Sequence, residues 1–235
     1  MWHDEVDQWG DEVCYSPEAD LIAGLVVGII GIDALRHTDE RRDLALAAVP
    51  VVLATHQLIE AVAWWGLQGQ VPPDIGDLAV SAYLVVALGI VPVVVPYAVM
   101  RCEPMSRRRA TMLPFVVLGL AVSIVLLFGM VVGPHSAAIG GRYIAYETTT
   151  PGGGLTAGLY GIAVCAPLLM SSHRRLVLFG LANIPVLVLL SVLLSTGLIS
   201  LWCIWAAAWS VVIAFHLRES STAQSTSSSR AAAAS

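Results

Sequence analysis

The chain has 235 residues, of which 57% are hydrophobic and 12% are charged, and its mean hydropathy is +0.78. A soluble globular domain carries about 25% charged residues, so this composition excludes an ordinary soluble domain and indicates an integral membrane protein. The net charge of −5 arises largely from an acidic segment ahead of the first apolar run. It does not indicate a nucleic-acid partner, and the expected partner is the lipid bilayer.

Seven apolar runs follow one another along the chain, and most approach the roughly 20 residues that cross about 30 Å of hydrocarbon. Because no water reaches the bilayer core, each run must satisfy its own backbone hydrogen bonds, which favours helices. The sequence therefore predicts an all-α, polytopic membrane protein with a seven-helix transmembrane domain over residues 20–218. The predicted spans are 21–35, 44–67, 78–100, 112–132, 155–170, 176–194 and 198–216.

Two polar segments flank this domain. Residues 1–19 form a predicted extracellular arm that is acidic, unlike the positively charged start of a cleaved signal peptide. We therefore expect the first apolar run to remain in the mature protein. Residues 219–235 are rich in Ser, Thr and Ala and have no apolar face to bury, which predicts a disordered cytoplasmic tail.

The arginines predict an orientation. All 12 basic residues are arginine, and all except Arg142 lie in the loops after the first, third and fifth runs or beyond the last run. Short loops rich in arginine remain cytoplasmic. The sequence therefore predicts a plasma-membrane protein with its N-terminus outside and its C-terminus in the cytoplasm.

Two irregular features follow in the middle of the chain. Pro92 and Pro96 lie inside the third run and predict a kink, because each lacks a backbone donor and crowds the preceding turn. The outer loop 134–154 is the longest, and its Tyr, Ile and Gly pattern predicts a small cap or hairpin.

The second run carries the main candidate site. His56, Glu60 and Trp64 follow one another at intervals of four residues, so they share one helix face, with Gln57 beside them. Ionisable side chains at membrane depth are costly and face the protein interior, where they often mark a site. In the predicted orientation, this stripe begins near mid-membrane and opens toward the outside.

Other runs offer partners for this stripe. Asp20 is in register with Gly24 and Gly28, a spacing that lets two helices approach closely and would bring Asp20 and Cys14 toward Trp64. The predicted ligand-binding set is His56, Gln57, Glu60, Trp64, Asp20 and Cys14. Further contributors to an aromatic-walled pocket are Asn183, Trp202, Trp205 and Trp209. Such a pocket would bind a small ligand, an ion or a lipid.

Three interpretations of this stripe remain open. The first is a ligand site in a protein that is not an enzyme, and the second is a purely structural polar cluster that joins helices. The third is a metal-dependent intramembrane hydrolase in which His56 is a zinc ligand and Glu60 is the general base, although the H-E-x-x-H pattern is absent. Catalytic residues are therefore unknown, and the sequence does not decide whether Cys14 pairs with Cys203.

Three segments carry a resemblance to a known family. The chain resembles an uncharacterised family of small bacterial membrane proteins, a domain of unknown function, over roughly residues 13–218. The resemblance implies seven helices, a bacterial cytoplasmic membrane and no assigned activity. The overall plan is also similar to that of the ceramidase and adiponectin-receptor group of membrane hydrolases, but their late paired histidines have no counterpart here. The segments that carry the family resemblance are 14–20, 31–36 and 56–67.

Overall fold

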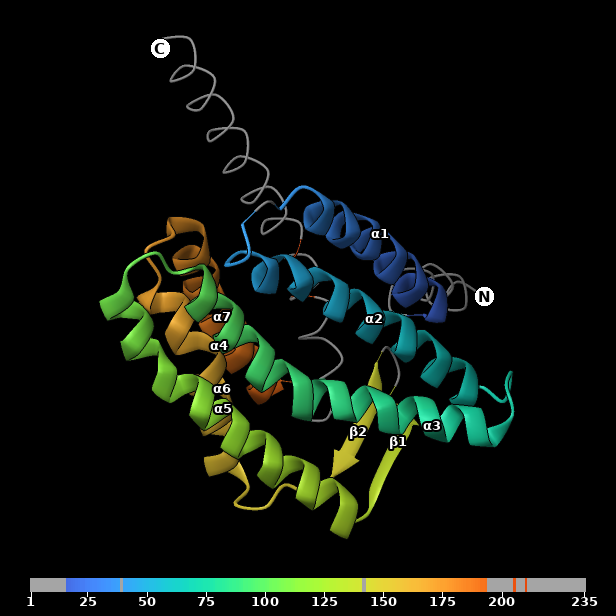
Figure 1. Ribbon diagram of the computed structural model, residues 1–235. Helices are drawn as coiled ribbons and strands as arrows, with labels where there is room; N and C mark the ends of the chain where they lie inside the picture. The colour runs from blue at the N-terminus through green and yellow to red at the C-terminus, as the bar shows by residue number, and fades with distance from the viewer. Residues whose placement is uncertain (1–15, 39, 141–142, 194–204, 206–209, 211–235) are drawn as a thin grey trace, which may run out of the picture.

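The computed structural model describes residues 16–38, 40–140, 143–193, 205 and 210. These residues form mostly helices, together with one antiparallel hairpin of two strands (Figure 1). The helices are α1 (Pro17–Arg36), α2 (Leu44–Leu67), α3 (Pro73–Leu84), α4 (Val91–Cys102), α5 (Ser106–Val132), α6 (Gly154–Met170) and α7 (Arg174–Leu193). The strands are β1 (His135–Ile139) and β2 (Ile144–Thr148).

The first six predicted spans each coincide with a continuous helical segment, and the hairpin predicted within residues 134–154 is present. Within the described part of the chain, three helical segments are long and apolar enough to cross a membrane: α2, the continuous run 73–102, and α5. The seventh predicted span lies outside the described residues, apart from Trp205 and Ser210. The protein is therefore a mostly helical chain with three candidate membrane-spanning helices.

Helix α1 packs against α2 through small residues. A Cβ added at Gly24 would lie 2.8 Å from Leu58 Cδ2, and one at Gly31 would lie 2.8 Å from Val51 Cγ2. The opposite face of α1 exposes large apolar side chains, with Ile29 exposed to 69%. The predicted close approach of these two helices is confirmed, and the exposed apolar face is typical of contact with lipid.

The third predicted span, for which the prolines predict a kink, contains a π-helical segment, Val85–Ile90, between α3 and α4. Pro92 has no N–H to donate to the helix, and ahead of it the N–H of Val91 donates to the Val86 carbonyl, five residues back. Side chains of neighbouring helices then donate to this segment: Tyr160 Oη bonds the Ala87 carbonyl at 2.8 Å, and Ser123 Oγ bonds the Gly89 carbonyl at 2.9 Å.

The Tyr160 hydrogen bond provides a first test. Tyr160→Phe is expected to lower the free energy of unfolding by about 1 kcal/mol, because the Ala87 carbonyl loses its donor. The measurement is SDS titration of the purified protein in mixed micelles. Tyr97, which is 43% exposed, provides the control, because Tyr97→Phe should change stability little. Equal effects of the two substitutions would contradict this role for Tyr160.

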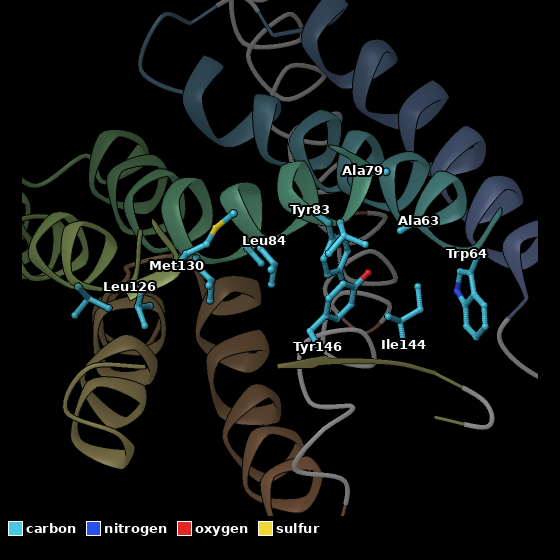
Figure 2. Close-up of a cluster of buried hydrophobic side chains, with 13 residues drawn as sticks. Ala63, Trp64, Ala79, Tyr83, Leu84, Leu126, Met130, Ile144 and Tyr146 are labelled. Atoms are coloured by element: carbon cyan, nitrogen blue, oxygen red, sulfur yellow. The ribbon is translucent and has the colours of Figure 1, made fainter. Parts of the chain in front are cut away.

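The chain reversals gather at two ends of the bundle. One end, here the arginine end, has a core where α1 ends, α2 begins, α4 ends and α5 begins, built from Ala34, Leu46, Cys102 and Met112 among others. The opposite end, here the hairpin end, has a core of residues from α2, α3, α5 and the hairpin (Figure 2). The described arginines in loops and terminal turns at the arginine end are Arg36, Arg41, Arg42, Arg101, Arg107, Arg108, Arg109, Arg174 and Arg175.

Candidate functional site

The polar stripe of α2 is completely buried. His56, Gln57 and Glu60 each have 0% exposure, and Trp64 has 3%. His56 lies against α3, where its Nε2 is 3.2 Å from the carbonyl oxygen of Tyr83. The stripe therefore faces neighbouring protein segments rather than lipid.

A stack of three rings joins α2, α3 and the hairpin. The His56 imidazole stacks on the Tyr83 ring at 3.8 Å and 16°, and Tyr83 stacks on Tyr146 at 4.5 Å and 14°. Figure 2 shows Tyr83 above Tyr146, with Ile144 between Tyr146 and Trp64. A second contact ties the hairpin to α3, because Ser81 Oγ is 3.4 Å from His135 Nε2. The hairpin therefore covers the polar stripe from its own end of the bundle.

Two adjacent side chains of α2 in this cluster have polar atoms without a hydrogen-bond partner among the described residues. They are His56, through Nδ1, and Gln57, through both Nε2 and Oε1. A buried polar group without a partner costs about 1–3 kcal/mol, so folded proteins rarely retain one without a reason. A cluster that served only to join helices would be expected to satisfy these atoms.

Helix α1 brings Asp20 to the end of the stripe that is nearer the hairpin end. Asp20 is 2% exposed, and its carboxylate interacts with the Trp64 indole. The indole Nε1 makes no hydrogen bond of ordinary geometry to the described residues, so the interaction between Asp20 and Trp64 is electrostatic. The α1–α2 packing thus produces the predicted approach of Asp20 to Trp64.

The remaining predicted contributors lie elsewhere or outside the described residues. Asn183 is buried between α6 and α7, where its Nδ2 donates to Cys165 Sγ at 3.4 Å. Trp205 packs against a cluster that contains Val86 and Val91 of the π-helical region and α4. The predicted contributors outside the described residues are Cys14, Trp202 and Trp209, and so is Cys203, the possible disulfide partner of Cys14.

A pocket of about 220 Å³ opens beside the turn between α2 and α3. Its lining residues are Ala63, Gly66, Leu67, Gly69, Val71, Pro73, Gly76, Asp77 and Val80. Ala63 follows Glu60 by three residues on α2, and Val80 precedes Tyr83 by three residues on α3. Because the two helices are antiparallel, both lining residues lie about one helical turn nearer the end of the bundle. The pocket therefore lies along the same α2–α3 interface as the polar stripe and nearer the end of the bundle.

The donor set for a metal is small. Among the described residues, no group of three or more His, Cys, Asp or Glu side chains comes together. His56 and Glu60 remain the pair that α2 itself offers, and Cys14 lies outside the described part of the chain. A zinc site would need ligands beyond those that the described residues bring together.

Tyr83 and Tyr146 belong to the cluster but are absent from the predicted set. Ile144 and Tyr146 are two residues apart in β2, and both are buried, with 0% and 6% exposure. This alternation was the available signal, since a strand with one buried face places every second side chain inward. Nothing in the sequence pairs either tyrosine with His56.

Comparison with known proteins gives one match. The model of DUF6629, described as a family of unknown function, matches residues 13–229. Searches of curated proteins and of solved structures found no match.

Proposed function

The chain belongs to DUF6629, a family of unknown function, and we propose that it is a multi-pass protein of the bacterial cytoplasmic membrane that binds a small polar ligand or ion. The proposed site is the polar stripe of α2, with His56, Gln57 and Glu60 at its base and Trp64 and Asp20 toward the hairpin end. The proposed topology is seven spans, with the N-terminus outside.

The charge distribution supports this orientation. Nine arginines gather at the arginine end, whereas the described charged residues of the hairpin end, His135 apart, are carboxylates. Short arginine-rich loops remain cytoplasmic, so the arginine end would face the cytoplasm and the hairpin would face outward. In this orientation the ligand reaches the stripe from outside the cell.

The observation that carries the proposed binding function is the Gln57 carboxamide. It is fully buried, and neither its oxygen nor its nitrogen has a hydrogen-bond partner among the described residues. A bound ligand, ion or water would satisfy these atoms, and His56 Nδ1 offers a further polar contact in the same turn. Ligand sites commonly combine apolar walls with a few such convergent polar groups.

Gln57→Met separates a ligand site from a structural cluster. Methionine has a similar shape without the amide, so we expect the thermal stability of the ligand-free protein to stay equal or rise. We also expect any small species that copurifies with the wild-type protein to be lost. Native mass spectrometry and thermal unfolding of the same preparations give both measurements.

The matched control is Gln70→Met, because Gln70 is exposed and lies beyond the end of α2. This control should retain the bound species. A marked loss of stability in Gln57→Met, with no change in what copurifies, would identify the stripe as a structural cluster and overturn the proposal.

A further inference from the structure

The pocket beside the α2–α3 turn has features of a site in its own right. Its walls are mostly apolar, including Leu67, Val71 and Val80, and its one carboxylate is Asp77. Its volume of about 220 Å³ is far more than a single water requires. An apolar chamber with one charged group is suited to a small amphiphilic molecule.

The pocket has a rigid frame. Gly66 of α2 and Gly76 of α3 approach so closely that a Cβ on either residue would overlap the Cα of the other. Gly69 adopts a φ of +72° in the turn that joins the two helices, a conformation that favours glycine. These glycines line the pocket themselves, so the contact that fixes the two helices also fixes the shape of the chamber.

Among the described residues at the hairpin end of the bundle, the charged side chains have one sign. Apart from the titratable imidazole of His135, the charged side chains of the described residues at the hairpin end are carboxylates. They are Glu18, Asp20, Asp74, Asp77 and Glu147. Asp77 forms no ion pair with any described residue. A cleft with charges of one sign concentrates ligands of the opposite sign.

We propose that this pocket binds the ammonium group of a small amine, with Asp77 as its counter-ion and the apolar walls in contact with the attached alkyl group. The inference does not depend on the function proposed for His56 and Gln57, because the lining residues are different. Two kinds of molecule could supply this ammonium group: a soluble amine, or the headgroup of phosphatidylethanolamine.

The test uses the full chain in nanodiscs of digalactosyldiacylglycerol, a lipid with neither charge nor amine. n-Butylammonium chloride and n-butanol, which have equal numbers of heavy atoms, are titrated calorimetrically, and empty nanodiscs provide the blank. We expect saturable binding of n-butylammonium and binding of n-butanol that is at least about fivefold weaker. Asp77→Asn should weaken n-butylammonium binding about fivefold, as for loss of a partly exposed ion pair.

Asp74→Asn is the matched control, because Asp74 lies on the same turn of α3 and carries the same charge but does not line the pocket. Asp74→Asn should leave the affinity for n-butylammonium unchanged. Gln57→Met should also leave it unchanged, because Gln57 does not line this pocket, so a failure of the function proposed for Gln57 would not affect this result. Equal binding of the amine and the alcohol, equal weakening by the two Asp substitutions, or no saturable binding to the wild-type protein would each overturn the proposal.

A second set of nanodiscs that contains phosphatidylethanolamine distinguishes the two sources. If this lipid weakens n-butylammonium binding to the wild type by competition, the lipid headgroup is the ligand. If the affinity is unchanged, the pocket binds a soluble amine.

Discussion

Gly119→Ala is expected to lower the free energy of unfolding by about 3 kcal/mol or more, at the upper end of the cost of overpacking. A Cβ at this position of α5 would overlap the carbonyl oxygen of Pro92 in α4. Because that oxygen belongs to the backbone, it cannot rotate away, and the two helices must separate. The separation would also strain the hydrogen bond from Ser123 Oγ to the Gly89 carbonyl, one turn along the same interface.

The control for Gly119 is a glycine in another helix. Gly158 of α6 has no atom within 4 Å of an added Cβ, so Gly158→Ala should be neutral or should stabilise the protein by up to about 1 kcal/mol through helix propensity. Unfolding of both variants by SDS in mixed micelles gives the comparison. A Gly119→Ala protein as stable as the Gly158→Ala protein would show that α4 and α5 are not packed as described.

Glu103→Ala is expected to lower the free energy of unfolding by about 3 kcal/mol, because it removes a buried, charged acceptor. Glu103 has 0% exposure and follows the end of α4. Its Oε2 accepts a hydrogen bond from Ser172 N at 2.8 Å, and its Oε1 accepts one from Ser172 Oγ at 2.6 Å. The carboxylate thus joins the α4–α5 loop to the exposed residue that precedes α7, and its loss would remove both of these hydrogen bonds.

The same carboxylate makes stability depend on pH. Burial alone would raise the pKa of Glu103, but the hydrogen bonds from Ser172 and from the Met105 backbone, together with the His173 charge, hold the pKa below its ordinary value of 4.5. Its stabilisation is therefore complete above pH 4.5 and is lost as the pH falls through the lower pKa of the folded state.

Glu103→Gln should consequently reduce the loss of stability below pH 4.5, which is the ordinary pKa of Glu. The control is Glu147→Gln, at an exposed position of β2, which should not reduce this loss. Melting temperature measured as a function of pH in detergent gives this comparison. Identical pH profiles for wild type and Glu103→Gln would exclude a role for this carboxylate in acid stability.

The polar stripe shows how much of the candidate site could be predicted from the sequence. Helical spacing was enough to place His56 and Glu60 on one face and to predict that this face is buried, because charge is costly in lipid. The ring stack was not predictable. Tyr83 and Tyr146 reach His56 only because α3 and the hairpin pack on α2, and tyrosine has no spacing rule across such distances in the chain.

The pocket at the α2–α3 turn and the contacts of Glu103 could not be predicted from the sequence either. Gly66, Gly76 and Asp77 lie in or near a short turn with no motif, and only the backbone contact between the glycines reveals the chamber. In the sequence, Glu103 lies in a loop close to several arginines and belongs to no motif, yet its carboxylate accepts hydrogen bonds from a residue in a different loop. Such pairs depend on which loops share an end of the bundle.

The sequence by itself determined the apolar, mostly helical character of the chain, the position of six helices, the hairpin between α5 and α6 and the burial of the α2 stripe. These properties follow from local physics: apolar length, helical period, turn residues and the cost of charge in hydrocarbon. Only the tertiary structure decided the π-helical segment, the ring stack, the partners of Glu103 and the pocket at the α2–α3 turn. Each of these depends on contacts between segments distant in the chain, and hydropathy and spacing describe only near neighbours.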